Sequence, residues 1–167
     1  MTMPGNHNRA EERLAQARRE IAHGGDLVPF FDALFAGADA EDILIADALV
    51  KIAAAAKSVL DNHQPGAIDV VLLSGPDPKE PQDMLVAVND DRPFLYDSAL
   101  RAAAAGGGRI RAAFHPIVQH QGKPVSVIVL LLDVVAERDT LTDTMRRAFA
   151  SGQLAVRDWK KMLEKLK

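Results

Sequence analysis

The stretch from Asp83 to Leu132 constrains the fold most, because its residue pattern predicts a strand, a helix and two further strands in close succession. Residues 84–88 are expected to form the first strand of this stretch. The corner that follows, residues 89–98, reads Asn-Asp-Asp-Arg-Pro-Phe-Leu-Tyr-Asp-Ser. Pro93 suits the first turn of a helix that ends at the glycines 106–108. Corners of this kind are where small α/β domains commonly hold ligands.

The remaining strands indicate an antiparallel sheet. Residues 109–119 alternate between apolar and polar side chains, and a hairpin turn at 120–123 leads into an apolar strand over 125–134. The run 68–73 predicts another strand, which we place in the sheet position that usually comes last. The alternation implies one apolar sheet face, covered by helices. The fold class is therefore α+β, a ferredoxin-like two-layer sandwich with an antiparallel sheet, preceded by an N-terminal helical segment.

Three helices are expected before the sheet. Residues 1–8 are polar and are expected to be frayed. Helical spacing of apolar residues then predicts helices over residues 9–22 and 27–35. A continuous apolar stripe predicts one long, alanine-rich third helix over residues 39–62, with an aspartate at its N-cap.

Two helices are expected after the last strand. Thr140 and Asp143 have capping-box-like spacing at the start of the first, and Gly152 is expected to end it. The second has apolar residues at i, i+3, i+4 and i+7, namely Trp159, Met162, Leu163 and Leu166. Phe149 and Trp159 lie on these helical stripes, so we expect them to be core or docking residues and not part of a cofactor site.

Length and composition fit one domain, or one domain plus a helical appendage. The 167 residues divide into an N-terminal helical segment, residues 1–66, and an α+β domain with a C-terminal helix, residues 67–167. The chain has no cysteine, which excludes disulfides, thiolate metal sites and cysteine nucleophiles and fits a reducing compartment. Its net charge of −3 argues against nucleic acid as a partner. The apolar run 125–132 is too short to span a membrane, and the N-terminus lacks the apolar core of a signal peptide, so we expect a cytoplasmic protein without a membrane partner.

Four corner residues are the candidate ligand-binding residues: Asp90, Asp91, Arg92 and Asp97. The three carboxylates lie near one helix N-terminus, where they could hold a metal, act as acid and base, or pair with the free N–H groups and the helix dipole. We favour the last of these, because no histidine in this segment completes a metal shell. An amino acid could bind there, with its ammonium group against the carboxylates and its carboxylate against the helix N–H groups.

No other motif forms a catalytic constellation. The glycines 106–108 follow a helix and precede a strand, so they end a helix and do not form a phosphate loop. His115 and His120 are five residues apart on one predicted strand, which places them on opposite faces, and His63 sits at a helix C-terminus, where the dipole explains it. No serine lies in a nucleophile motif. We therefore predict no catalytic residue, no metal site and no cofactor in this chain, which indicates a binding or interaction module.

The corner and the C-terminal helix resemble those of a known family. Residues 89–98, followed by a helix and by Phe-His-Pro-Ile-Val at 114–118, resemble the N-terminal region of the large bacterial NAD-specific glutamate dehydrogenases. Those proteins carry an Asp-Asp-Met-Pro-Phe-Leu-Val-Asp-Ser corner and then a His-Pro-hydrophobic strand. Residues 154–162 are similar to the Val-x-x-Ala-Val-x-Asp-Trp-x-x-Met helix of the family. Phe30-Phe31, Asp42 and the long third helix are similar to its opening helices.

The resemblance implies that the α+β domain is the first of several ACT-like domains that precede a distant catalytic domain. It also implies a regulatory or assembly role within an enzyme that oxidatively deaminates L-glutamate to 2-oxoglutarate with NAD. The cofactor NAD and the catalytic residues would then belong to other parts of the parent enzyme. One departure concerns the corner, because amino-acid-binding ACT domains usually place glycine after the proline. This chain has Phe94 there, and we expect its ring to hinder the approach of a ligand.

Two functions follow as alternatives. In the first, the chain is a non-catalytic ACT-like domain that packs against other domains of the same polypeptide or against copies of itself. In the second, it is a small-molecule sensor that binds an amino acid at the corner of residues 89–98.

Overall fold

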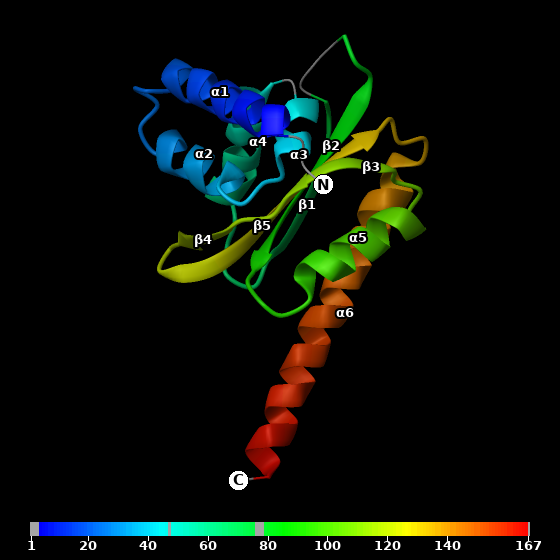
Figure 1. Ribbon diagram of the computed structural model, residues 1–167. Helices are drawn as coiled ribbons and strands as arrows, with labels where there is room; N and C mark the ends of the chain where they lie inside the picture. The colour runs from blue at the N-terminus through cyan, green and yellow to red at the C-terminus, as the bar shows by residue number, and fades with distance from the viewer. Residues whose placement is uncertain (1–3, 47, 76–78, 167) are drawn as a thin grey trace.

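A central antiparallel sheet lies between two helical layers in the computed structural model, which describes residues 4–46, 48–75 and 79–166 (Figure 1). The strands are β1 (Ile68–Ser74), β2 (Gln82–Asp90), β3 (Ile110–Phe114), β4 (Ile117–His120) and β5 (Lys123–Asp133). Their order is β1-β2-β5-β3, and β4 also pairs with β5. Every pairing is antiparallel, and β1 lies at the edge beside β2, in the place that the last strand of a ferredoxin-like sheet takes. The predicted α+β fold class is confirmed.

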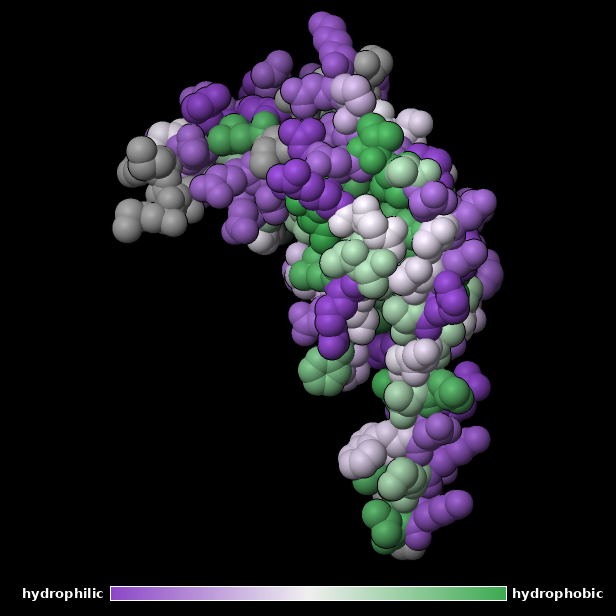
Figure 2. Space-filling view, turned by 90° about the vertical axis from the view of Figure 1, so that its right-hand side faces the viewer, coloured by the Kyte–Doolittle hydropathy of each residue, from purple (hydrophilic) through white to green (hydrophobic). Residues whose placement is uncertain are grey.

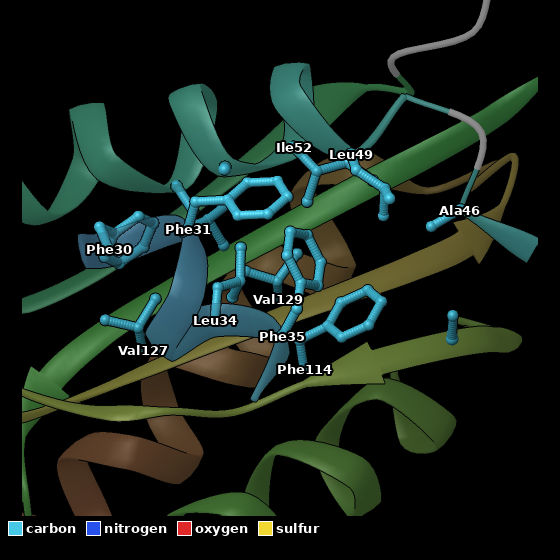
Figure 3. Close-up of a cluster of buried hydrophobic side chains, with 14 of the residues drawn as sticks. Phe30, Phe31, Leu34, Phe35, Ala46, Leu49, Ile52, Phe114, Val127 and Val129 are labelled. Atoms are coloured by element: carbon cyan, nitrogen blue, oxygen red, sulfur yellow. The ribbon is translucent and has the colours of Figure 1, made fainter. Parts of the chain in front are cut away.

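The N-terminal helices cover one face of the sheet. They are α1 (Pro4–Glu20), α2 (Leu27–Phe35), α3 (Ala40–Ile45) and α4 (Leu49–Asp61). Figure 3 shows apolar side chains of α2 and α4 pointing toward Phe114, Val127 and Val129 of the sheet; those of the helices are Phe31, Leu34, Phe35, Leu49 and Ile52. The ring of Phe35 contacts those of Phe31 and Phe114 edge to face, with centroids 4.9 and 5.0 Å apart. This segment is therefore part of the sheet's core, and the domain boundary at residue 66 stays a prediction.

The prediction of one long third helix is wrong, because the chain breaks into α3 and α4. Ala46 is buried and has an extended backbone with ψ 97°. Arg13 of α1 donates hydrogen bonds to the carbonyl oxygens of Ile43 (3.0 Å), Leu44 (2.6 Å) and Ala46 (2.6 Å). The guanidinium satisfies carbonyl groups that a continuing helix would bond internally, so α3 ends there.

The helices α5 (Leu95–Ala105) and α6 (Arg138–Lys165) cover the other sheet face. Their apolar side chains share a second core with those of β1, β2 and β5, including Val70, Leu85, Ala87, Leu95, Ala99, Ile128, Leu130, Leu132, Leu141, Met145 and Phe149. Both faces of β2 and β5 are thus buried, and the expectation of a single apolar face is wrong. It rested on residues 109–119, which are edge strands, whereas the uninterrupted apolar runs of β2 and β5 are typical of strands covered on both sides.

Two elements near the corner differ from the prediction. The expected strand over residues 109–119 is interrupted at His115 and Pro116, so that β3 and β4 pair separately with β5. The helix α5 begins at Leu95 and not at Pro93. The cause is Phe94, whose backbone is left-handed with φ 67° and cannot form part of a helix.

The first and last helices are longer than predicted. α1 begins at Pro4, so of the residues 1–8 that were expected to be frayed, residues 4–8 are helical, and residues 1–3 lie outside the described part of the chain. α6 runs for 28 residues straight through Gly152, and the separate last helix that the sequence predicted is its second half. No helix in the described part of the chain is long and apolar enough to cross a membrane.

The free edge of β1 is covered by arginines of α6. Arg138 Nη2 donates to the carbonyl oxygen of Leu72 (3.0 Å), and Arg146 Nη2 donates to that of Val70 (2.9 Å). Arg138 Nη1 also pairs with the buried Asp83 of β2 at 2.7 Å. These contacts fix α6 against the sheet and block strand addition at this edge.

Candidate functional site: a corner network and an exposed helical stripe

The four corner residues that were predicted to bind a ligand have different surroundings in the structure. Asp90, at the end of β2, contacts a buried histidine, and Arg92 reaches across to α6. Asp91 is exposed. Asp97 is exposed in the first turn of α5, where its carboxylate complements the helix dipole. Two of the four side chains are thus engaged within the chain, and ligand binding by this set stays a prediction.

The buried histidine is His63, which follows α4 and is 1% exposed. Its Nδ1 lies 2.7 Å from Asp69 Oδ2, and its Nε2 lies 3.0 Å from Asp90 Oδ1. A neutral imidazole carries one N–H, so both nitrogens donate to carboxylates only in the protonated ring. The geometry therefore fits a cation held between two carboxylates. The sequence indicated only a histidine at a helix end, because its partners lie 6 and 27 residues away.

Asp90 is held in its ionised form by its surroundings. Burial raises the pKa of its carboxyl group, but hydrogen bonds from His63 and the Gly66 N–H, with the charges of His63 and Lys123, lower the pKa further than burial raises it. The Gly66 N–H donates to Asp90 Oδ2 at 2.8 Å. His120 of β4 lies beside this group, with Nε2 3.2 Å from the carbonyl oxygen of His63. The network thus joins the end of α4 to β1, β2 and β4.

Two side-chain hydrogen bonds hold α6 near this network. Arg92 Nη2 donates to the carbonyl oxygen of Phe149, and Gln153 Nε2 donates to that of Gly66 at 3.1 Å. A Cβ atom at Gly152 would lie 3.3 Å from Arg92 Nη2, so the glycine leaves room for the guanidinium. Burial lowers the pKa of Arg92, and the charge of Asp90 opposes that shift. The corner therefore anchors α6 at the point where the helix leaves the sheet.

The buried amide of Asn89, the first residue of the corner, has no partner among the described residues. Both polar side-chain atoms of Asn89 are buried and make no hydrogen bond within the described part of the chain. Its cross-strand neighbour is the buried Ser126. An amide offers one acceptor oxygen and a donor NH₂ group, so Asn89 could accept a hydrogen bond from a small polar ligand and donate another to it.

A second polar site lies between the loop after α2 and the end of β3. A cavity of about 180 Å³ is lined there by Asp39, Asp42, Tyr96 and His115, among others. The rings of Tyr96 and His115 are stacked with centroids 3.8 Å apart. Burial is the main cause that raises the pKa of Asp42 and of Tyr96. Across the described residues, no group of three histidine or acidic side chains is placed to hold a metal ion.

The second half of α6 projects beyond the sheet and carries exposed apolar side chains (Figure 1). We call Trp159, Met162, Leu163 and Leu166 the α6 stripe; they are 59, 57, 44 and 81% exposed. Figure 2 shows apolar residues in green along this projecting part, beside the basic and acidic residues in purple. Phe149 is fully buried, so of the two aromatic residues expected to be core or docking residues, one lies in the core and Trp159 is exposed.

A comparison with models of protein families identifies a family to which the chain is similar. The family model of the glutamate dehydrogenase ACT1 domain matches residues 30–148. The matched region runs from α2 into the first half of α6 and contains the whole sheet, the corner and His63, whereas the α6 stripe lies outside it. A comparison with curated proteins finds no match.

Proposed function

The chain belongs to the glutamate dehydrogenase ACT1 domain family, and from this premise we propose that it is a non-catalytic regulatory and assembly domain of an NAD-dependent glutamate dehydrogenase. The parent enzyme would oxidatively deaminate L-glutamate to 2-oxoglutarate in the cytoplasm, and NAD would bind to its other domains. The partners of this chain would be those domains or further copies of the chain.

The observation that carries the assembly role is the α6 stripe. Large apolar side chains that lie exposed side by side on one element mark surfaces that bind another protein. Trp159 is the strongest candidate for an anchor, because tryptophan contributes disproportionately to binding energy at interfaces. The edge of β1 is covered by arginines of α6, so it is not free to pair with a strand of another protein, and assembly through the side chains of the stripe is favoured.

The proposal is tested by mixing the purified chain with the remaining domains of its parent dehydrogenase and measuring binding by calorimetry. The chain alone should not reduce NAD in the presence of glutamate, and it should bind those domains or itself. Trp159→Gln should weaken binding at least tenfold. Leu154→Gln is the matched control, because Leu154 is 54% exposed on the same helix but lies off the stripe. Glutamate-dependent NADH formation by the chain alone, or the absence of any binding, would refute the proposal.

Amino-acid sensing at the corner is the second candidate, and the partnerless amide of Asn89 favours it. A bound amino acid could pair with this amide and with Arg92, whose present partner is a backbone carbonyl. The common amino acids should then raise the melting temperature of the chain in proportion to the logarithm of their concentration, and Asn89→Leu should abolish the rise. No shift at millimolar amino acid would leave only the assembly role.

A further inference from the structure

We propose that the α6 stripe binds the same stripe of a second copy of this chain, with the two helices antiparallel. This inference rests on the proposed assembly role and names the partner. Three features of α6 support the pair: its heptad pattern, the fit of large and small residues, and the charges beside the stripe.

One apolar heptad pattern runs along α6 from Leu141 to the end of the helix, whereas the core position before Leu141 is occupied by the charged Arg138. Its first core position is occupied by Met145, Gly152, Trp159 and Leu166, and its second by Leu141, Ala148, Ala155 and Met162. A third row, Phe149, Val156 and Leu163, flanks them. In the first half of the helix these positions are buried against the sheet and α5, whereas the second half presents the same positions to solvent. A heptad repeat of this kind is the pattern by which one helix packs along another.

An antiparallel partner fits the exposed half residue by residue. When two copies cross between residues 160 and 161, Trp159 lies opposite Met162 of the second copy, and Ala155 lies opposite Leu166. A large residue thus meets a smaller one in each layer, and the methionine sulfur meets the indole ring. A parallel pair would place Trp159 on itself and Ala155 on itself, which gives one overfilled layer and one empty layer.

The charges beside the stripe fit the same register. Asp158 and Lys165 occupy the polar flanking position, seven residues apart. In the antiparallel pair, Asp158 of each copy lies next to Lys165 of the other, and the twofold symmetry makes this ion pair twice. The other charged residues of the exposed half, Arg157, Lys160, Lys161 and Glu164, lie on the outer face of the helix.

The expected affinity is moderate. Residues 154–166 span about 20 Å of helix, and two such faces bury an area at or below the lower end of the roughly 1,200–2,000 Å² of specific interfaces. We therefore expect dimerisation with a Kd of about micromolar magnitude.

The test uses the full chain in sedimentation equilibrium, together with the fluorescence of Trp159, which is the only tryptophan. The chain should dimerise with rising concentration, and the emission should shift to the blue as the indole is buried. Asp158→Lys and Lys165→Asp should each weaken the dimer about tenfold, because each replaces two ion pairs by two repulsions. The double variant should restore the affinity to within about threefold. Glu164→Lys is the matched control, a similar charge change on the outer face, and should leave the dimer intact.

Several results would refute the proposed antiparallel pairing of two α6 helices. A chain that stays monomeric up to about 1 mM, or a double variant that is no better than the single ones, would refute it. So would a blue shift that appears only with vesicles of phosphatidylcholine and phosphatidylglycerol. A chain that stays monomeric but binds the remaining domains of the dehydrogenase would refute the antiparallel helix pair and support the assembly role. A chain that dimerises but binds none of those domains would support the helix pair and limit the assembly role to self-association.

Discussion

Replacing His63 by leucine should destabilise the chain by about 3 kcal/mol, because it removes a cation that two carboxylates share. The imidazole is buried, so no water takes its place, and leucine fills a similar volume. A hydrogen bond between charged groups contributes about 1.5–3 kcal/mol. The carboxylates of Asp69 and Asp90 are 33 and 39% exposed and keep part of their hydration, so we take the lower end of that range for each.

The free energy of unfolding is best measured by urea titration with far-ultraviolet circular dichroism. Fluorescence would not serve, because Trp159 lies on the exposed stripe and does not report on the core. Asp61→Asn is the matched control, since Asp61 forms an exposed ion pair with Lys57 within α4 and should contribute less than about 0.5 kcal/mol.

The pH dependence of this difference follows from Asp90. The pKa of Asp90 is lowered in the folded chain, so its contribution is fully present above the ordinary value of 3.8 and is lost as the pH falls through the folded pKa. In His63→Leu the cation that lowers this pKa is absent. The stability difference between the original chain and His63→Leu should therefore shrink as the pH falls below 3.8. A difference under about 0.5 kcal/mol at pH 5, or one that does not change between pH 5 and pH 3, would refute the ion-pair reasoning.

Three further substitutions test other contacts. Asp83→Ala removes a buried carboxylate that pairs with Arg138 and accepts the Val135 N–H, and it should lower the unfolding free energy in urea by about 3 kcal/mol; a loss under about 1 kcal/mol would contradict this account. Phe94→Gly should raise the melting temperature, because glycine relieves a left-handed backbone that costs about 1 kcal/mol and the side chain that is removed is already 74% exposed; a lower melting temperature would show that the ring packs against the fold. Arg13→Met keeps the apolar stem but removes the hydrogen bonds to α3, so amide exchange in α3 should accelerate at least tenfold while the β5 amides stay protected.

The sheet could be predicted from the sequence because its signals are local. The corner of residues 89–98, the glycines after α5 and the turn at Gln121 and Gly122 each punctuate the chain within a few residues. The antiparallel order and the edge position of β1 followed from placing these elements in a split βαβ arrangement.

The other sheet face and the corner network depend on contacts that are remote in the sequence. The only sequence signal that helices cover the second face is the uninterrupted apolar runs of β2 and β5. Such a run is also typical of a buried helix segment, so it is a weak indicator of a strand covered on both faces. The break between α3 and α4 depends on Arg13, some 30 residues earlier. The cation of His63 depends on two aspartates in different strands. Periodicity reports the face on which a side chain lies, and none of these pairings leaves a periodic trace.

The single long helix α6 shows why the sequence predicts two helices where the structure has one. Gly152 is a poor helix former, costing about 1 kcal/mol relative to alanine, and on propensity alone it is a reasonable place to end a helix. Here it leaves room for Arg92, whose hydrogen bond to the Phe149 carbonyl adds support at that point. The apolar repeat continues past it without a change of register, so the end of the sheet, and not the helix, decides which residues are buried. Positions that hold the first half of α6 against the sheet and α5 are therefore available in the second half to bind a separate helix.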